Sequence, residues 1–233
     1  MINHPFEGEP VAQKFDFPTI IVERERNETF YLQGDPADSV FYLENGHVKL
    51  TVLSGDGKEA VVGILGPGAF FGESCLADRR ETDVSATALT RSVAKKIAKA
   101  EMVLALRKQP QFTEFFLSRV LSRKIRLEED LADQLCNPCE MRLARTLLFF
   151  AEFGQGGHSV PVNPRIDQHT LAAMVGTTQP RISFLLHRFK ERGFVDCVDR
   201  LRVNRSLLEL VRVPPAQENS QTSSPDYLLL NNA

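Results

Sequence analysis

The sequence lacks the features that would place it in a membrane or outside the cell. It contains no run of about 18 apolar residues, the length that a membrane-spanning helix needs. Its first residues, MINHPFEGEPV, have neither the positive charge nor the apolar stretch of a secretory signal. Cysteine is scarce, with 4 in 233 residues, and this number does not make the disulfide framework of a small secreted domain. We therefore expect a cytoplasmic protein with no membrane partner.

Patterns that indicate catalysis or a bound metal are missing as well. The 5 histidines are scattered along the chain with no spacing typical of metal ligands. We find no nucleophile–base arrangement, no phosphate-binding glycine loop and no interpretable pair of carboxylates. The sequence therefore predicts no enzyme and no particular cofactor.

Charge is small in total but unevenly distributed. The formal net charge is −2. Residues 1–115 carry 13 Lys and Arg against 17 Asp and Glu, whereas residues 162–212 carry 9 against 5. A chain of this length can form one large domain or two small ones. The distribution predicts a basic module joined to a neutral or acidic one.

The first half of the chain alternates short β-branched and aromatic segments with turn residues. The expected strands are TIIVERE, TFYLQGD, SVFYLENGHVKLTVL, EAVVGILG and VSATAL followed by SVAKKI. Within the third segment, Asn45-Gly46 predicts a tight hairpin, because both central residues of a type I′ turn need positive φ. Many short strands at this spacing predict an antiparallel sandwich or jelly roll, which we assign to residues 1–110.

A long helix is expected next, over residues 111–136. The segment FTEFFLSRVLSRKIRLEEDLADQL contains no Gly or Pro and repeats apolar residues at helical spacing. The apolar stripe is wider than a coiled-coil seam, and Lys124 and Glu128 interrupt its heptad register. Such a helix can pack one side on its own β domain and the other on a second subunit, so we predict a dimerisation helix. The alternative is a helix packed wholly inside one chain.

Two cysteines, Cys136 and Cys139, stand at the end of this helix. Two thiols could supply half of a zinc or iron–sulfur site, or form a redox pair. Helix capping explains the same segment without a site, with Asn137 as N-cap, Pro138 in the first turn and Glu140 completing a capping box. Because no second Cys-x-x-Cys accompanies the pair, the sequence favours capping and predicts no metal site.

Residues 167–192, DQHTLAAMVGTTQPRISFLLHRFKER, have the pattern of a helix-turn-helix. The first helix ends at Gly176, and the second spans residues 179–192. Two short apolar segments, GFVDCV and LRVN, follow as a small β-wing. We expect a winged DNA-binding domain over residues 137–213 and a flexible tail over residues 214–233. The predicted contacts between the two helices involve Leu171, Ala172, Val175, Ile182, Leu185 and Phe189.

The other face of the second helix carries groups that can read base edges. Arg181 can donate two hydrogen bonds to guanine, Gln179 can pair with adenine, and Phe184 can touch a thymine methyl. A merely solvated charged face is the alternative, but the wing and the local positive charge favour DNA. Polar and cationic neighbours would contact phosphates. The predicted DNA-binding residues are Gln168, His169, Thr178, Gln179, Pro180, Arg181, Phe184, Arg188, Lys190 and Arg200.

Three motifs in this order resemble the Crp/Fnr family of bacterial transcription regulators, over roughly residues 17–210. GDPADSVFYLENGHVKL is similar to the first half of a cyclic-nucleotide-binding jelly roll, and LGPGAFFGESCLADRRETDVSATAL to the phosphate-binding cassette of that domain. The third motif is the winged helix-turn-helix. The resemblance implies an α+β fold and a homodimer that binds a palindromic site in double-stranded DNA under the control of an effector. RNA polymerase is a further implied partner. The alternative is a cyclic-nucleotide-binding signalling module that acts through protein partners.

The cassette departs from the family pattern at one position. In relatives that bind cyclic nucleotides, a Gly-Glu pair holds the ribose and an Arg-Ser pair holds the cyclic phosphate. Gly72 and Glu73 match the first pair, but the second reads Val84-Ser85 and lacks the arginine. Without that arginine the phosphate would be desolvated and uncompensated, which argues against cyclic AMP.

Arg79, Arg80 and Arg91 are the candidate replacements for the missing arginine near the cassette, although their spacing does not select one of them. The positions that contact adenine from the dimer helix in the cyclic-AMP regulator hold Leu127 and Glu128. The cassette would then bind another small-molecule effector, or be vestigial and filled by its own side chains. The effector-binding residues that the resemblance implies are Gly72, Glu73, Ser74, Val84, Ser85, Leu127 and Glu128.

Overall fold

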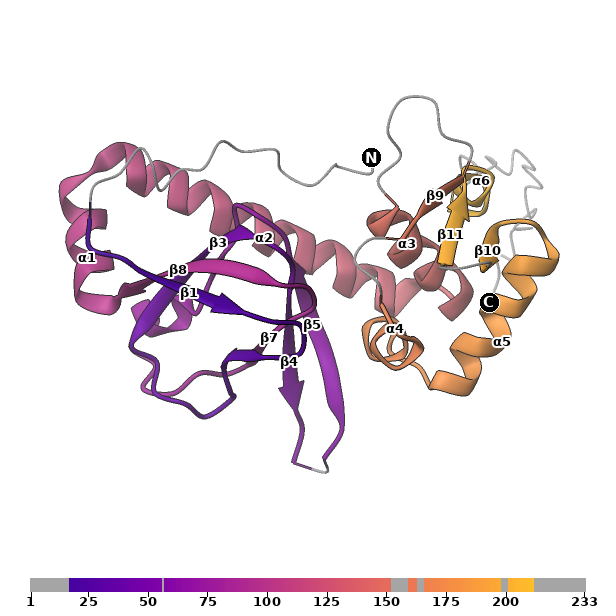
Figure 1. Cartoon of the computed structure of the whole chain (residues 1–233), viewed down its shortest axis with the longest axis horizontal. Helices are drawn as coiled ribbons and strands as arrows, with labels where there is room; N and C mark the ends of the chain where they lie inside the picture. Colours follow the sequence, from indigo (N-terminus) through magenta and orange to yellow (C-terminus); the bar gives the residue numbers. More distant parts are fainter. Residues whose placement is uncertain (1–16, 56, 152–158, 163–165, 198–200, 212–233) are drawn as a thin grey trace, which may run out of the picture.

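Two four-stranded antiparallel sheets form the N-terminal domain of the structure, which is a computed structural model (Figure 1). It describes residues 17–55, 57–151, 159–162, 166–197 and 201–211. One sheet has the strand order β1-β8-β3-β6 and the other β2-β7-β4-β5, so the predicted β sandwich is confirmed. The strands are β1 (Ile20–Arg24), β2 (Thr29–Tyr31), β3 (Ser39–Asn45), β4 (Val48–Leu53), β5 (Glu59–Leu65), β6 (Phe70–Phe71), β7 (Ser85–Ala88) and β8 (Ser92–Ala98).

An aromatic cluster fills the space between these two sheets. Phe41 of β3 and Phe71 of β6 stack with their ring centroids 5.0 Å apart. Phe30 and Tyr31, from β2 in the other sheet, pack against the same two rings. Burying aromatic side chains is among the largest favourable contributions to folding. The cluster therefore fixes β6, which leads directly into the predicted cassette.

The predicted hairpin at Asn45-Gly46 is wrong. β3 pairs with β6 and β8, whereas β4 pairs with β5 and β7, so the two strands belong to different sheets. Of the two turn residues only Gly46 has positive φ, at 88°. A Cβ at Gly46 would lie 2.4 Å from the carbonyl oxygen of Arg91 and 2.3 Å from Oγ of Ser92. The glycine is therefore required by a close approach between chain segments where β3 crosses to the second sheet.

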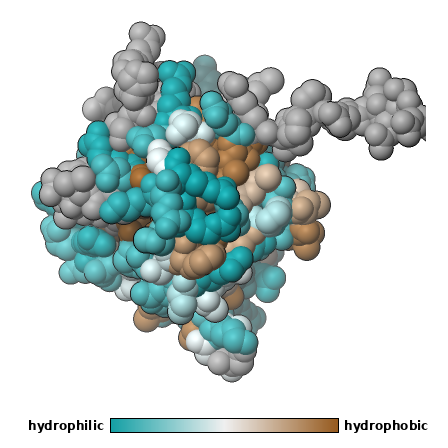
Figure 2. All heavy atoms as spheres, turned by 90° about the vertical axis from the view of Figure 1, so that its right-hand side faces the viewer, coloured by the Kyte–Doolittle hydropathy of each residue, from teal (hydrophilic) through white to brown (hydrophobic). Residues whose placement is uncertain are grey.

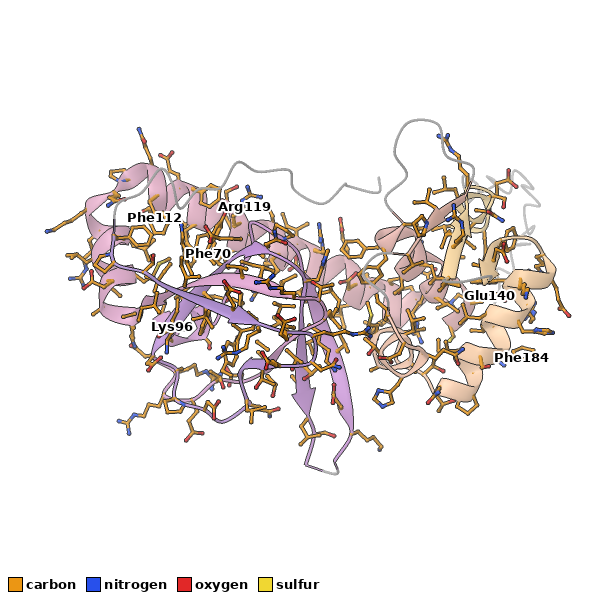
Figure 3. All side chains as sticks on the ribbon, in the orientation of Figure 1. Phe70, Lys96, Phe112, Arg119, Glu140 and Phe184 are labelled. Atoms are coloured by element: carbon orange, nitrogen blue, oxygen red, sulfur yellow. The ribbon has the colours of Figure 1, made fainter. Side chains whose placement is uncertain are left out.

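The long helix α2 (Pro110–Cys136) follows a shorter helix, α1 (Lys99–Lys108), and runs from the sandwich to the C-terminal domain (Figure 1). On its inner side Phe112 and Phe116 are buried against Phe70, as Figure 3 shows for Phe70 and Phe112. The outer side exposes a row of apolar side chains. No described helix, α2 included, is apolar enough over a sufficient length to cross a membrane. The exposed apolar residues of α2 are Leu117, Leu121, Ile125, Leu127, Leu131 and Leu135.

In its described residues, the C-terminal domain combines four helices with a small three-stranded sheet of order β10-β11-β9. One buried cluster joins its elements, and all six predicted helix–helix contact residues belong to it. β10 and β11 form the expected wing, to which the structure adds β9 as a third strand. The elements are α3 (Cys139–Phe150), β9 (Ser159–Pro161), α4 (Gln168–Val175), α5 (Gln179–Glu191), β10 (Val195–Cys197), β11 (Leu201–Asn204) and α6 (Leu207–Val211).

The two domains also touch away from α2. β5 of the sandwich lies beside α4, as Figure 1 shows. Ile64 of β5 packs against the hydrophobic core of the C-terminal domain. The position of the helix-turn-helix therefore depends on the sandwich as well as on the long helix.

Candidate functional site

The turn between α4 and α5 is built by local hydrogen bonds. Asp167 caps α4, because its Oδ1 accepts a hydrogen bond of 2.7 Å from the backbone N–H of Thr170. Gly176 ends the helix in the left-handed conformation, with φ of 69°. The N–H of Thr177 then donates to the carbonyl of Ala172 at 2.9 Å. These bonds fix the angle at which α5 leaves the turn.

The exposed side of α5 presents three side chains of the predicted DNA-binding set. Gln179, Arg181 and Phe184 are exposed, and Phe184 has 51% of its surface accessible. The guanidinium of Arg181 lies 5.4 Å from the centre of the Phe184 ring, and that of Arg188 lies 5.8 Å from the same centre. Cation–π contacts of this kind restrain the arginines. Figure 3 shows Phe184 on the edge of the domain.

Arg188 has a second contact that sequence reasoning missed. Glu140 of α3 pairs with Arg188 at 3.4 Å and with Arg192 at 3.3 Å, so one carboxylate holds two arginines of α5. Arg188 is half-buried there. Figure 3 shows Glu140 close to α5. The pair fixes α5 against α3, and only charge complementarity between distant segments, residues 140 and 188–192, could have indicated it.

The predicted capping box at the start of α3 is therefore wrong. Pro138, not Asn137, is the N-cap of α3, and Glu140 points to α5. Asn137 instead ends α2, where its Nδ2 donates to Oδ1 of Asp133 at 2.7 Å. A long-range ion pair has taken the carboxylate that the local motif would have used.

The remaining predicted DNA-binding residues are distributed around the ends of α4 and α5. Five of them are exposed, and Arg200 lies outside the described residues. Figure 2 views this end of the molecule and shows a mostly hydrophilic surface with smaller hydrophobic patches. The exposed five are Gln168, His169, Thr178, Pro180 and Lys190.

The cassette begins where β6 ends. Gly72 has φ of 76°, and a Cβ there would lie 2.8 Å from the carbonyl oxygen of Ser39, so only glycine fits without strain. Glu73 and Ser74 open a short 3₁₀ helix, η2 (Glu73–Ala77), and both are half-buried. Tyr31 lies beside Gly72, and burial followed by the charge of Glu73 raises its pKa well above the ordinary value. Tyr31 therefore stays a neutral hydroxyl at the floor of the cassette.

Arg123 of α2 is a cassette residue that sequence reasoning missed. Its Nη2 forms an ion pair with Oε1 of Glu73, and its Nη1 donates to the carbonyl oxygen of Phe70 at 3.0 Å. Arg123 stands seven residues after Phe116, so the helical period already places it on the inner side of α2. The carboxylate that would hold a ribose is thus occupied by an arginine of the same chain.

The second half of the cassette reaches the same aromatic cluster without supplying a cation. Val84 packs against the cluster that contains Phe71, and Oγ of Ser85 accepts a hydrogen bond of 2.9 Å from the backbone N–H of Gln33. Leu127 is partly exposed on α2. Glu128 lies on the outer side of α2, where it pairs with Lys124. Gly72 and Val84 therefore both border the aromatic cluster, whereas Glu128 does not contact it.

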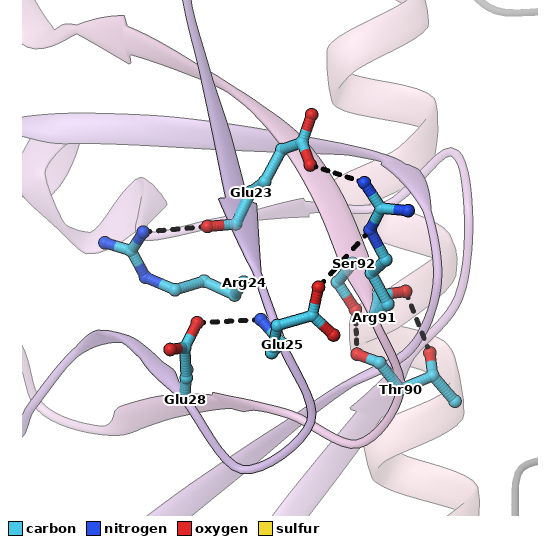
Figure 4. Close-up of polar contacts among 7 residues, drawn as sticks. All are labelled: Glu23, Arg24, Glu25, Glu28, Thr90, Arg91 and Ser92. Carbon is cyan, nitrogen blue, oxygen red and sulfur yellow. Dashed lines mark hydrogen bonds and ion pairs between the residues drawn. The ribbon is translucent and has the colours of Figure 1, made fainter.

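The three arginines considered as replacements lie elsewhere. Arg91 pairs with Glu23 at 2.8 Å and with Glu25 at 3.5 Å on the edge of the first sheet (Figure 4). Arg79 lies 3.7 Å from Asp83, and Arg80 is exposed. Arg123 is the arginine that contacts Glu73.

The two cysteines of the Cys-x-x-Cys lie where α2 ends and α3 begins. Cys136 is exposed, Cys139 is half-buried, and both are free thiols. Within the part of the chain that the structure describes, no three His, Cys, Asp or Glu side chains gather as metal ligands would.

Comparison with known proteins agrees with this division of the chain. Residues 21–109 match the family of cyclic nucleotide-binding domains, and residues 141–213 match the Crp-like helix-turn-helix domain. A CRP-like cAMP-activated global transcriptional regulator of Mycobacterium tuberculosis is 30% identical over 186 residues, covering 78% of this chain and 80% of that protein. A cyclic AMP receptor protein of Thermus thermophilus is 30% identical over 172 residues, covering 73% of this chain and 76% of that protein.

Solved structures show the same fold at lower sequence identity. FixK2 from Bradyrhizobium japonicum superimposes with a TM-score of 0.72 at 17% identity, covering 85% of this chain and 100% of that one. TTHB099, a regulator of the CRP family from Thermus thermophilus, gives a TM-score of 0.69 at 21% identity, covering 81% of this chain and 94% of that one. Sandwich, long helix and winged helix-turn-helix therefore occur together in both. The chain is a member of the Crp/Fnr family of transcription regulators, with a cyclic-nucleotide-binding-type domain and a DNA-binding helix-turn-helix domain.

Proposed function

We propose that two copies of this chain bind a two-fold symmetric operator, with α5 of each copy in the major groove. The exposed face of α5 is the observation that carries the proposal. Gln179, Arg181 and Phe184 point outward, while the opposite side of the same helix is buried in the core. A recognition helix needs this division, because its inner side must be fixed for its outer side to read bases. Arg181 is assigned to guanine and Phe184 to a thymine methyl.

Phosphate contacts are assigned to the exposed polar groups around that face. Gln168 and His169 stand in the first turn of α4, next to its positive N-terminal end. Thr178 precedes α5, and Lys190 lies in its last turn. Contacts of this kind fix the register of a protein on DNA without reading sequence. Arg188 and Arg200 complete the proposed set, Arg188 while bonded to Glu140.

The homodimer is assigned to the outer side of α2. The apolar row from Leu117 to Leu135 is exposed in the single chain and has the length of several helical turns. A second copy with the same row would remove both rows from water, which is the dominant favourable contribution to association. Two DNA-binding domains carried by one pair of helices would meet successive turns of the duplex.

We assign RNA polymerase, in the cytoplasm, as the partner of the DNA-bound regulator. We assign the cassette a regulatory ligand other than cyclic AMP, and two features support this choice of ligand. Val84 supplies no charge for a cyclic phosphate, and Glu73 is already bonded to Arg123. A ligand that took Glu73 would release Arg123, and a change in α2 would alter the positions of both recognition helices.

Selection of bound fragments from random DNA, using the full chain, tests the proposal. We expect an enriched site with dyad symmetry, and footprinting that protects two half-sites one helical turn apart. The chain with Gln179→Ala and Arg181→Ala together should enrich no site while its far-UV circular dichroism is unchanged. A single asymmetric half-site, or a monomer in solution scattering at the same concentration, would contradict the dimeric arrangement.

A further inference from the structure

Lys124 and Glu128 interrupt the heptad spacing of the exposed apolar residues on the outer side of α2, next to Ile125 and Leu127. Stepping along the helix by alternating four and three residues gives Leu117, Leu121, Lys124, Glu128, Leu131 and Leu135. This alternation is the spacing of a coiled-coil seam. All six side chains are exposed, with Lys124 and Glu128 at 63% and 58%. Two leucines thus stand on each side of the charged pair.

The opposite side of the same turns is already in use. Phe116 is buried against the sandwich, and Arg123 bonds Glu73 and the Phe70 carbonyl. Arg123 and Lys124 are neighbours, so α2 cannot turn its charged pair inward without breaking the bond to Glu73. The pair therefore remains on the side that faces away from its own domain.

Lys124 and Glu128 form an ion pair of 2.5 Å within one chain. Exposed pairs at this spacing contribute little to the stability of a single helix. In a dimer joined along the row, the same four charges would be enclosed between leucine layers. In a parallel dimer in register, Lys124 would face the partner's Lys124 and Glu128 the partner's Glu128. Each lysine would also have a carboxylate one helical turn away on its own chain and another on the partner, and these opposite charges would offset the like-charge pairs.

We propose that Lys124 and Glu128 of two copies form a four-charge layer at the centre of the dimer interface, which sets the register of the two helices and selects the partner. This inference rests on the proposed homodimer and goes beyond it. A shift by one heptad would place each charge against leucine, and enclosing an unpaired charge is strongly unfavourable. A related chain with apolar residues at these positions would make a poor dimer partner, because it would leave Lys124 and Glu128 without opposite charges across the interface.

Charge exchange tests the layer with the full chain. Lys124→Glu places four carboxylates in a homodimer and Glu128→Lys places four ammonium groups, so each variant should self-associate roughly tenfold more weakly, or worse. Mixed in equal amounts with different affinity tags, the two variants should form mainly heterodimers, which native mass spectrometry counts. The double variant Lys124→Glu/Glu128→Lys should regain homodimers. Glu129→Lys, an exposed change off the row, is the matched control and should associate like the unaltered chain.

The outcomes separate the two proposals. If the unaltered chain is dimeric but both single variants dimerise normally and mix at random, the charged layer is refuted and the dimer stands. If the unaltered chain is a monomer at micromolar concentration, the homodimer and the layer are both refuted. Heterodimer preference together with recovery in the double variant supports the layer, and it also shows that each single variant folds.

Discussion

Arg181 and Phe184, two side chains of α5 that we propose to contact bases, also contact each other. The guanidinium lies over the ring, 5.4 Å from its centre, so the arginine is restrained before DNA arrives. Arg181→Ala should weaken operator binding by about 1–3 kcal/mol and relax the preference at one base pair in each half-site. Lys190→Ala should weaken binding to all DNA sequences alike. It should also lower the slope of log binding constant against log salt concentration by about one.

Fluorescence anisotropy with the operator and its single-base variants, over a series of salt concentrations, measures both effects. Arg181→Lys keeps the charge but loses the two-pronged donor, so it should resemble the alanine variant in sequence preference. An equal loss on every sequence for Arg181→Ala would make this residue a phosphate contact instead.

The N-cap of α4, Asp167, makes the stability of the fold depend on pH. Burial alone would raise its pKa, but hydrogen bonds from Thr170, with nearby His169 and Lys49, hold the pKa below the usual value. A carboxylate with a lowered pKa stabilises the fold above its unfolded pKa, about 3.9, and this contribution is lost as the pH falls through the folded pKa. Asp167→Ala should therefore lower the free energy of unfolding by about 1 kcal/mol at pH 7.

Urea titrations followed by circular dichroism at several pH values check this prediction. The difference between the unaltered chain and Asp167→Ala should shrink in acid, below about pH 4. Asp167→Ser keeps a capping oxygen that does not titrate, so its stability should stay near that of the unaltered chain at pH 7. A difference that stays constant down to pH 2 would show that the cap acts without its charge.

Residues that act through local chemistry could be predicted from the sequence, and residues that act across the fold could not. The exposed face of α5 follows from helical periodicity alone, and the structure agrees for Gln179, Arg181 and Phe184. Glu140 and Arg123 were missed because their partners stand 48 and 50 positions away in the chain. No local pattern encodes such a pairing, although the period of α2 does place Arg123 on the inner side.

At the scale of elements, most strands and helices could be predicted, and the errors have one cause. The spacing of apolar residues locates α2, α4 and α5, because this spacing is a property of each segment and requires no distant partner. The Asn45-Gly46 hairpin and the capping box at Asn137 failed because both motifs are satisfied only when no distant group competes. At Asn45-Gly46 the competing groups are strands β8 and β7, which pair with β3 and β4, and at Glu140 they are the two arginines of α5.

The direction of the two long helices in the dimer is testable at its exposed end. Leu135 is 77% exposed in the last turn of α2. In a parallel dimer in register, the two copies of this position face each other, within the Cα separation of about 4.4–6.8 Å that a disulfide needs. Leu135→Cys, made together with Cys136→Ser and Cys139→Ser, should therefore cross-link two chains rapidly under diamide.

Gel electrophoresis without reductant gives the readout. Glu129→Cys in the same background is the off-row control and should remain uncross-linked. An antiparallel pair would leave Leu135→Cys uncross-linked but join it to Leu117→Cys when the two variants are mixed. That result would contradict an arrangement in which both DNA-binding domains stand at one end.

At the scale of the whole molecule, the sensor domain and the DNA-binding domain share more than α2. Ile64 of β5 is packed against the C-terminal core, and the positive charge of Lys49 in β4 lowers the pKa of Asp167, the cap of α4. A sequence pattern cannot reveal this contact, because its two sides are separated by about a hundred residues and belong to different domains. It gives the sandwich a direct influence on the helix that precedes the recognition helix.

Because the two domains are in contact, a ligand in the sandwich would affect the stability and DNA binding of the whole chain. We expect cyclic AMP to have no such effect. A ligand at about 100 times its Kd stabilises a protein by about 2.7 kcal/mol, which raises the Tm of a domain of this size by several degrees. With Val84 in place of the phosphate-binding arginine and Glu73 held by Arg123, 1 mM cyclic AMP should change neither the Tm nor the operator affinity.

Differential scanning calorimetry and anisotropy titrations, each with and without 1 mM nucleotide, measure both quantities. The cAMP-activated regulator of Mycobacterium tuberculosis is the positive control under the same conditions. Arg123→Ala frees Glu73 but adds no cation for the phosphate, so it should also remain unresponsive if the missing arginine is decisive. A response in Arg123→Ala alone would assign the insensitivity to the Glu73–Arg123 bond, whereas a response in the unaltered chain would show that another group neutralises the phosphate.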